Sequence, residues 1–207
     1  MIQLEGPENN NGILWIKLNR PSSGNSLHPT LVRELLSALC TTDTDPAVCI
    51  IILIGNSCFF CTGIDLLSKQ ELSFALGDDF HAVNKILIII KKILVAAVIP
   101  YNLIYIGMVP KAGSSISFSK LISKVLPAKG FLERVTEVAG RLAQAPQGSL
   151  VQTKRLLKKT TTKDLLDAND RECRVIVEER IPSGDLRRGR EVFQAVQREK
   201  ERRKSAL

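Results

Sequence analysis

The sequence predicts an α/β fold, and three consecutive segments near the start of the chain carry that prediction. Residues 12–21 (GILWIKLNRP) alternate apolar and polar side chains as a half-buried strand does. Residues 29–40 (PTLVRELLSALC) repeat leucine at helical spacing behind a proline that suits a first helical turn. Residues 47–55 (AVCIIILIG) form a continuous, largely β-branched run, typical of a strand covered on both faces of a parallel sheet. Strand, helix and strand with short connections make one α/β crossover unit.

The rest of the chain continues this pattern and then becomes helical. We expect residues 65–92 to be mainly helical with a break near Gly77, and residues 93–99 (ILVAAVI) to form a further buried strand. The predicted organisation is therefore an α/β core over residues 1–129 and a C-terminal helical region over residues 130–207. The helices expected in that region cover 130–146, 149–161, 163–181 and 184–204, the first with Leu132, Val135, Val138, Ala139 and Leu142 on one side.

Composition and charge exclude several classes of protein. The five cysteines are irregularly spaced among 207 residues, which predicts a reducing compartment and not a secreted disulfide framework. The net charge is +8, and residues 151–207 hold 16 basic and 10 acidic side chains. Phe193 is the one aromatic residue interleaved with those charges, so we do not expect nucleic-acid binding and interpret the charged stretch as a solvated helix surface.

One apolar stretch resembles a membrane span by length. Residues 86–109 (ILIIIKKILVAAVIPYNLIYIGMV) carry Lys91 and Lys92 in the middle and Pro100 in the second half. Each charge at the bilayer centre costs roughly 2.5–3.5 kcal/mol on insertion scales. A helix followed by a buried strand explains the run better, and no membrane span is expected.

Residues 57–66 (SCFFCTGIDL) admit three interpretations: a zinc site, a redox pair or a turn that holds a negative oxygen. Zinc needs four ligands, and no second pair accompanies Cys58 and Cys61. A redox pair normally has small residues or proline between its cysteines, where this chain has two phenylalanines. The remaining candidate ligands are scattered along the chain, as Cys40, Cys49, Cys173, His28 and His81. No metal site is expected, and position alone makes His28 the N-cap of the first helix.

The third interpretation, which we favour, depends on the backbone. Gly63 permits a tight turn at the carboxyl end of a strand, and a helix is expected to begin at about Asp65. The N–H groups of Gly63 and Ile64 would then be unsatisfied donors at a helix N-terminus, which attract anionic oxygen. This arrangement supplies half of an oxyanion hole.

At this point the sequence resembles the enoyl-CoA hydratase/isomerase (crotonase) family. The resemblance lies in ILWIKLNRPSSGNSLHPTLVRELLSAL, DPAVCIIILIGNSCFFCTGIDL and MVPKAGSSISF, in this order, with weaker matches in the C-terminal helices. The nearest branch is that of the peroxisomal Δ3,Δ2-enoyl-CoA isomerases. It implies a crotonase-like spiral of ββα units, here shortened, that binds a fatty acyl-CoA. Coenzyme A is then part of the substrate, and no separate cofactor is implied.

The resemblance also implies roles for particular residues. Ile64 matches the residue whose N–H donates to the thioester oxygen, and such donors stabilise the enolate formed by proton removal. The residues that match those flanking the CoA are Asn25, Ser26, Leu27, Thr62, Gly63, Ile64, Asp65 and Leu66. Family members commonly form trimers, so a homo-oligomer is expected if the core is intact.

Two departures from the family pattern predict impaired catalysis. Pro100 occupies about the place of the glycine-rich turn that gives the second oxyanion donor, and a strand-and-helix portion is missing beyond it. Lys111 stands where the isomerase branch has its catalytic glutamate. A lysine cannot take over that role unless burial lowers its pKa greatly. The nearest carboxylates, which we expect to be surface or capping groups, are Asp65, Glu71, Asp78 and Asp79.

The expected function is therefore that of an enoyl-CoA isomerase or hydratase-like protein of fatty acid β-oxidation, with impaired catalysis. The alternative is a non-catalytic paralogue that binds acyl-CoA or forms oligomers. The terminal Ser-Ala-Leu (205–207) partly matches a peroxisomal signal, so we expect a peroxisomal location, with the cytoplasm or mitochondrion as alternatives.

Overall fold

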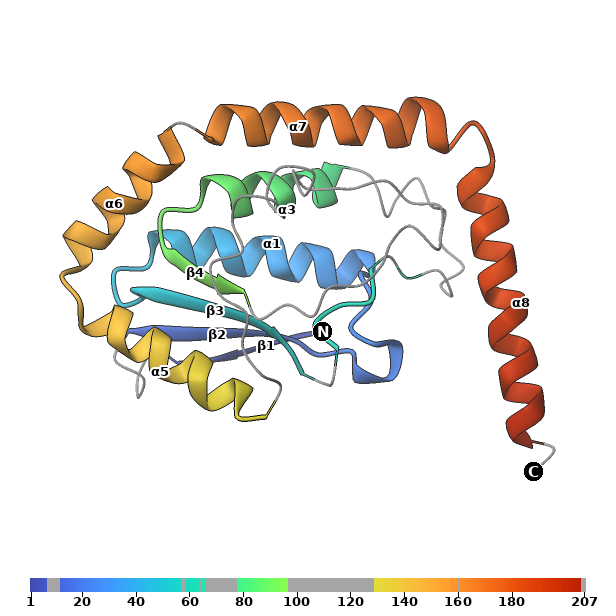
Figure 1. Ribbon diagram of the computed structural model, residues 1–207, viewed down its shortest axis with the longest axis horizontal. Coiled ribbons are helices and arrows are strands. Elements are labelled where there is room, and N and C mark those ends of the chain that lie inside the picture. Colours follow the sequence, from blue (N-terminus) through green and yellow to red (C-terminus); the bar gives the residue numbers. More distant parts are fainter. Residues whose placement is uncertain are drawn as a thin grey trace.

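The computed structural model describes residues 1–6, 12–56, 59–63, 65, 78–96, 129–159 and 161–205. Within them, a mixed α/β fold is built on a four-stranded sheet of order β1-β2-β3-β4 (Figure 1). Strand β1 pairs antiparallel with β2, whereas β2, β3 and β4 run parallel. The strands are β1 (Ile2–Glu5), β2 (Ile13–Leu18), β3 (Ile50–Gly55) and β4 (Ile93–Ala96). The predicted parallel crossover is confirmed.

Strand β3 is buried on both faces, as its β-branched run predicts. Ile51 and Leu53 pack into one apolar cluster with helices α1 (Pro29–Thr44) and α3 (Asp78–Ile89). Ile50 and Ile52 point the opposite way and pack with Val135 of helix α5 (Phe131–Gln144). Because successive side chains of a strand alternate between its faces, a run without polar residues needs a cover on each side. Figure 1 shows α1 and α3 on one face of the sheet and α5 on the other.

Helix α1 (Pro29–Thr44) begins where the sequence predicts. The side chain of His28 accepts a hydrogen bond from the backbone N–H of Thr30 at 3.2 Å, which confirms its role as the N-cap. Proline at the first helical position loses no hydrogen bond, because that N–H has no partner within the helix. The side chains that the helix buries are Pro29, Leu31, Val32, Leu35, Ala38, Leu39 and Thr42.

Helix α5 (Phe131–Gln144) confirms the first C-terminal helix and corrects one residue of its apolar face. Val135 and Ala139 are buried against the sheet, with Phe131 and Leu142 partly buried beside them. The side chain of Leu132 is 52% exposed. The buried stripe starts at the first helical residue, and Leu132, one position on, is rotated about 100° away from it.

The remaining helices wrap around the α1–α3 side of the sheet (Figure 1). Helix α3 (Asp78–Ile89) packs on α1 and on α7 (Thr162–Arg174), and α6 (Gln147–Lys159) contacts β4. A π-helical turn (Val175–Arg180) continues α7, and α8 (Asp185–Ser205) follows after a turn. These bounds confirm the three remaining predicted C-terminal helices, and α8 extends down one side of the molecule to the C-terminus.

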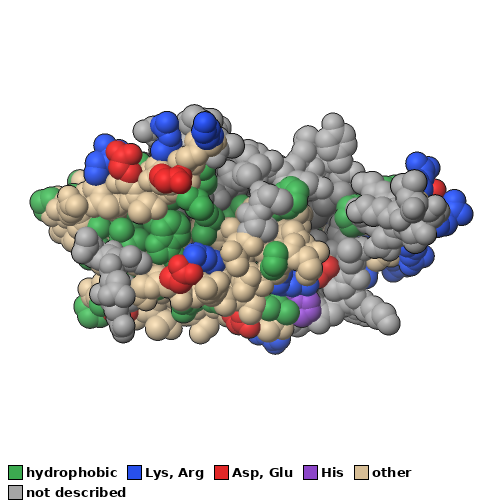
Figure 2. Space-filling model, turned by 90° about the horizontal axis from the view of Figure 1, so that it is seen from below, with side chains coloured by type: hydrophobic (Ala, Val, Ile, Leu, Met, Phe, Trp, Pro, Cys, Tyr) green, Lys and Arg blue, Asp and Glu red, His purple; other side chains and the backbone are tan. Residues whose placement is uncertain are grey.

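The face of the sheet that carries α5 is only partly covered by described residues. Trp15, Ile54 and Ile93 are partly buried around the α5 cluster. Seen from that side, apolar side chains gather over the part of the molecule where α5 and the sheet lie (Figure 2). Among the described residues, no helix combines the length and the apolar character needed to cross a bilayer. Residues 93–96 of the apolar run form β4, and 97–109 lie outside the described residues.

Candidate functional site

Two loops meet at the carboxyl edge of the parallel sheet, one after β2 and one after β3. The register pairs Leu18 with Gly55, so the two strands end side by side. The backbone N–H of Asn56 donates to Leu18 O at 2.8 Å, and its side-chain amide donates to Asn19 Oδ1 at 3.0 Å. The loops therefore leave the sheet together. Ligands bind at this edge in open α/β folds.

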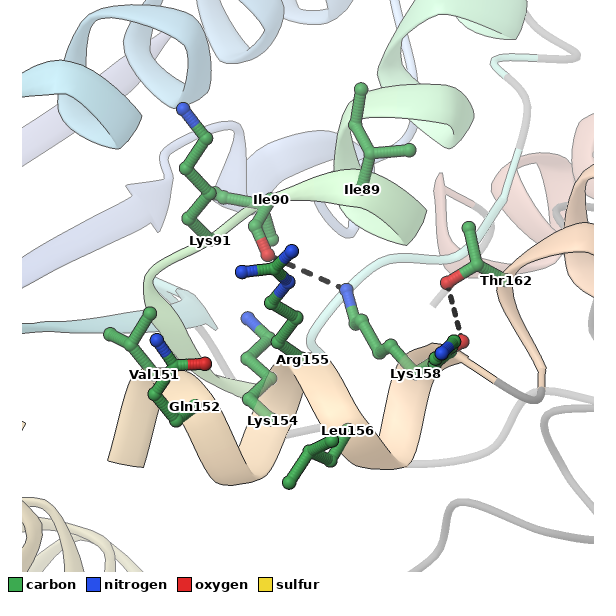
Figure 3. A pocket seen from close by; sticks show the side chains of 11 residues that line it. Ile89, Ile90, Lys91, Val151, Gln152, Lys154, Arg155, Leu156, Lys158 and Thr162 are labelled. Carbon is green, nitrogen blue, oxygen red and sulfur yellow. Dashed lines mark hydrogen bonds between the residues drawn. The ribbon is translucent and has the colours of Figure 1, made fainter. Parts of the chain in front are cut away.

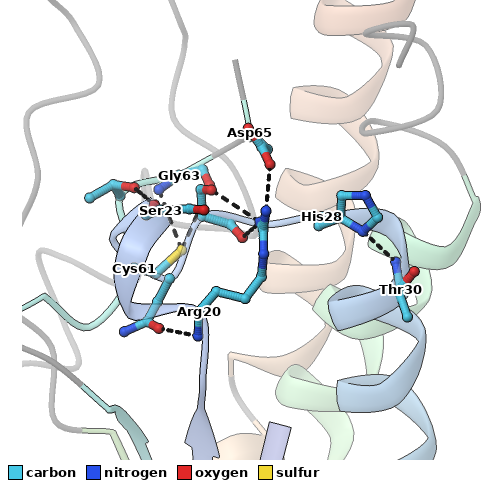
Figure 4. Close-up of polar contacts among 10 residues, drawn as sticks. Arg20, Ser23, His28, Thr30, Cys61, Gly63 and Asp65 are labelled. Atoms are coloured by element: carbon cyan, nitrogen blue, oxygen red, sulfur yellow. Dashed lines mark hydrogen bonds and ion pairs between the residues drawn. The ribbon is translucent and has the colours of Figure 1, made fainter. Parts of the chain in front are cut away.

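Backbone hydrogen bonds then hold the two loops together beyond the strands. Figure 4 shows the side-chain contacts of Arg20, Cys61 and Asp65 in the same region. The N–H of Thr62 donates to Gly24 O at 3.0 Å, and the N–H of Leu27 donates to Gly63 O at 2.7 Å. The N–H of Asp65 donates to Leu27 O at 3.3 Å. Both neighbours of the residue between Gly63 and Asp65 are thus fixed to the opposite loop. We call residues 20–27, 59–63 and 65, with these bonds, the paired turn.

Asn25 is built into the scaffold of the paired turn. It is fully buried and has a φ of 57°, the one positive φ of a described non-glycine residue. Its Oδ1 accepts from the backbone N–H of Arg20 at 2.8 Å, and its Nδ2 donates to Phe59 O at 2.8 Å. Asparagine tolerates the left-handed conformation better than other non-glycine residues. The side chain predicted to flank the CoA therefore joins the two loops.

Arg20 is a site residue that the sequence reasoning missed. Its guanidinium pairs with the Asp65 carboxylate at 2.8 Å, and the two side chains are only 15% and 11% exposed. The same guanidinium donates to Ser26 O at 2.6 Å and to Ser26 Oγ at 3.2 Å. Asp65 and Ser26 were predicted as substrate-flanking residues, and the structure places both against Arg20. The only local sign of this role in the sequence is that Arg20 is a basic residue just before the predicted turn.

Glycine is required where the paired turn approaches the sheet. Gly63 has a φ of 94°, which confirms the tight turn predicted there. A Cβ on Gly55 would lie 2.2 Å from Phe59 O, and one on Gly24 would lie 2.6 Å from Thr62 Cγ2. Side chains at these positions would push the two loops apart. Glycine therefore sets the close approach of the loops.

Cys61 is a partly buried thiol that contacts the backbone of the turn. Its Sγ accepts a hydrogen bond from the backbone N–H of Gly63 at 3.3 Å. Burial raises the pKa of Cys61, and the Gly63 amide and the Arg20 charge offset this only in part. A raised pKa leaves little thiolate at neutral pH, which disfavours the redox interpretation. Within the described ranges, no group of three or more His, Cys, Asp or Glu residues is arranged to hold a metal ion.

Several predicted residues lie outside the described part of the chain. These are Ile64, Leu66, Glu71, Cys58, Pro100 and Lys111. Of the other nearby carboxylates, Asp78 opens α3 and Asp79 is half-buried in its first turn. Since the Gly63 N–H is already directed at Cys61, the oxyanion prediction rests on the amide of Ile64.

A cavity of about 730 Å³ lies at the opposite edge of the sheet, between α6 and the end of α3 (Figure 3). Lys154 donates to Lys92 O, just before β4 begins, and Lys158 donates to Ile88 O at the end of α3. Burial, with help from the charge of Lys158, lowers the pKa of Lys154 from 10.5 to about 8. These lysines satisfy one carbonyl at the amino end of β4 and one at the carboxyl end of α3. The cavity is therefore not part of the paired turn.

Comparison with known proteins connects this fold to one family. Residues 8–103 match the enoyl-CoA hydratase/isomerase family. The chain is 32% identical over 142 residues to a mitochondrial enoyl-CoA hydratase of Pongo abelii, covering 64% of this chain and 49% of the relative. It is 29% identical over 181 residues to a probable enoyl-CoA hydratase of Mycobacterium tuberculosis, covering 83% and 66%. The chain thus spans about half to two thirds of the length of these curated relatives.

Solved structures share the fold at low sequence identity. An enoyl-CoA hydratase/isomerase from Pseudoalteromonas atlantica superposes with a TM-score of 0.77 at 18% identity, covering 94% of this chain and 96% of that one. An enoyl-CoA hydratase from Bacillus halodurans gives a TM-score of 0.71 at 16% identity, covering 92% and 99%. These likenesses confirm the crotonase-like fold. The family match and the curated relatives show that part of this chain is similar in sequence to the enoyl-CoA hydratase/isomerase family.

Proposed function

We propose that the protein binds fatty acyl-CoA thioesters at the paired turn, where the backbone N–H of Ile64 donates to the thioester oxygen. One observation carries this proposal: hydrogen bonds from Leu27 and to Leu27 fix Gly63 and Asp65, the two neighbours of Ile64. An oxyanion donor is effective only when its position is set before the reaction, because reorienting it would cost the energy it provides. The fixed neighbours supply that preorganisation.

The chemistry proposed is stabilisation of an enolate without efficient proton transfer. Removing a proton next to a thioester places negative charge on the carbonyl oxygen, and one fixed donor contributes on the order of 10²–10³ in rate. The carboxylate that the structure places in the paired turn, Asp65, is engaged by Arg20. Lys111 replaces the glutamate of the isomerase branch in the sequence. Lacking a positioned acid/base group costs on the order of 10²–10⁴ in rate.

The test separates binding from turnover. Purified protein is titrated calorimetrically with a saturated acyl-CoA, and its turnover of 3-enoyl-CoA and 2-enoyl-CoA is followed at saturating substrate. We expect saturable binding, with isomerisation and hydration at least about 10²-fold slower than in an active family member assayed in parallel. Turnover equal to that enzyme would contradict the impairment, and an absence of binding would overturn the whole proposal.

A second candidate function is favoured by the lysine at position 111. Without a catalytic carboxylate there, the protein could still act as a subunit that binds acyl-CoA or joins a homo-oligomer of the trimer type. Binding without any turnover, together with a trimeric mass in light scattering, would select this candidate.

Two finer proposals rest on the resemblance to the isomerase branch. The first is that the protein is an isomerase and not a hydratase, and the second is that it acts in β-oxidation in the peroxisome. Preference for 3-enoyl-CoA over 2-enoyl-CoA would support the first of these.

A further inference from the structure

A cluster of polar side chains joins α3 to α7, far from the paired turn in sequence. His81 lies on α3, and Asn169, Asp170 and Cys173 lie on α7, which packs directly on α3 (Figure 1). Asn169 and Cys173 are four positions apart, so they share one face of the helix. None of these residues has a role in the proposed acyl-CoA chemistry.

The distances describe a thiol, an imidazole and a carboxylate in series. The Sγ of Cys173 lies 3.3 Å from Nδ1 of His81. The other ring nitrogen, Nε2, lies 3.2 Å from Oδ1 of Asp170. That carboxylate oxygen is buried, and among the described residues it accepts no hydrogen bond of good geometry. A neutral His81 with its proton on Nε2 would satisfy it.

A buried amide pair assigns the same tautomer independently. Asn84 and Asn169 are 3% and 0% exposed, and Asn84 Nδ2 donates to Asn169 Oδ1 at 3.2 Å. With its oxygen occupied, Asn169 turns Nδ2 toward His81 Nδ1 at 3.1 Å. The Asn169 N–H needs the lone pair of Nδ1 as its acceptor, and the Cys173 thiol, which also lies 4.0 Å from Asn169 Oδ1, shares that lone pair. The resting imidazole is therefore arranged as a base toward Cys173.

The thiol is also within reach of small molecules in solution. Cys173 is a reduced thiol and is partly exposed, and the side chain of His81 is 27% exposed. A nucleophile beside a base that a third group orients is the recurring arrangement of activated cysteine and serine sites. Cys61, which is also partly buried, differs because its Sγ accepts a backbone N–H and no base is described beside it.

We propose that Cys173 is a nucleophilic thiol that reacts with low-molecular-weight disulfides, with His81 as its general base and Asp170 as a positioning residue. The Sγ attacks one sulfur of the disulfide, and its proton passes to Nδ1 of His81. An Sγ–S bond forms and the S–S bond of the reagent breaks. The leaving thiolate takes up the proton, so one disulfide yields one mixed disulfide and one thiol.

The test measures modification at individual cysteines with the aromatic disulfide dithiobis-nitrobenzoate, quenched at intervals and analysed by peptide mass spectrometry. Cys40 on α1 is exposed and serves as the internal reference. We expect Cys173 to react about tenfold faster than Cys40 at pH 7, and His81→Gln to remove this advantage. Equal rates at the two cysteines, or a Cys173 rate unchanged in His81→Gln, would overturn the proposal.

Two further measurements distinguish activation from a structural effect. If His81→Gln opened the fold, the partly buried Cys61 would react faster than in wild type, so its rate is compared in the same digests. The pH profile tests the base and its positioning residue. Among the described residues, His81 pairs with Asp170 of α7, and Lys85, one helical turn along α3, is exposed. We expect the wild-type rate to level off below the ordinary thiol pKa of about 8.5 and the Asp170→Ala rate to level off at higher pH. An identical profile in both proteins would exclude a positioning role for Asp170.

Discussion

The two edges of the parallel sheet are built in opposite ways. At the carboxyl edge, backbone groups and glycines join the two loops, and the charged pair is Arg20 with Asp65, of opposite sign. At the amino edge, Lys154 and Lys158 reach across from α6 to satisfy carbonyls, and like charges crowd each other. The first edge fixes the backbone of two loops, whereas the second satisfies carbonyls at the ends of α3 and β4. The cavity at the amino edge therefore lies apart from the proposed acyl-CoA site.

The largest effect is expected from the ion pair at the carboxyl edge. Arg20→Met leaves the Asp65 carboxylate largely buried without its partner and removes the bonds to Ser26. Breaking such a pair costs about 3–5 kcal/mol, which urea denaturation would measure. The control is Arg141→Met, which breaks an exposed pair with Glu137 and should cost about 0–1 kcal/mol. Equal losses in the two variants would show that the paired turn does not depend on Arg20.

The next effect concerns the proposed donor itself. Ile64→Pro removes the backbone N–H, whereas Ile64→Val keeps it with almost the same side chain. We expect Ile64→Pro to lower any isomerisation rate on the order of 10²–10³-fold and Ile64→Val to leave it nearly unchanged. Thermal melting of both variants controls for the fold. Should the proline variant melt like wild type and retain its rate, the amide is not the oxyanion donor.

A glycine pair compares the paired turn with a helix surface. Gly24 has a φ of 58° and little space beside Thr62, so Gly24→Ala should cost about 1–3 kcal/mol of unfolding free energy. Gly140 on α5 has open space where a Cβ would lie, and Gly140→Ala should gain about 0.5–1 kcal/mol. Chemical denaturation should therefore show a lower unfolding free energy for Gly24→Ala and a higher one for Gly140→Ala than for wild type. A stabilising Gly24→Ala would contradict the tight fit between the loops.

Helices and strands were predictable from the sequence where adjacent residues showed which of their faces would be buried or where they would begin. The β-branched run of β3 indicated cover on both faces, and His28 before Pro29 indicated the start of α1, because both signals depend on adjacent residues. The buried face of α5 was predicted to begin with Leu132, whereas Phe131 is partly buried and Leu132 is exposed. Helical spacing alone does not show which residue of the first turn meets the sheet. The periodicity of apolar residues predicted the bounds of the helices, but tertiary packing determines which of those apolar residues are exposed.

The candidate site was predictable in its backbone and not in its side chains. Gly63 indicated the turn because a positive φ favours glycine. The pairing of Arg20 with Asp65 spans 45 positions, and that of His81 with Cys173 spans 92. The two residues of the second pair were considered only as scattered metal ligands. Contacts of this kind depend on how the helices and loops pack, and no local pattern encodes them.

The last prediction concerns Lys154 at the amino edge and the pH dependence of its contribution to stability. The folded protein releases the Lys154 proton near pH 8, whereas the unfolded chain holds it up to about 10.5. Between these values the unfolded state binds more protons, so raising the pH stabilises the fold. Relative to Lys154→Met, wild type should therefore gain unfolding free energy from pH 8 to 10.5 and show no such gain below pH 8. Lys159→Met, on the exposed side of α6, controls for the loss of one positive charge. If the difference in unfolding free energy between wild type and Lys154→Met stayed constant from pH 8 to 10.5, Lys154 would be solvated like a surface lysine. The two edges of the sheet would then differ less than the structure indicates.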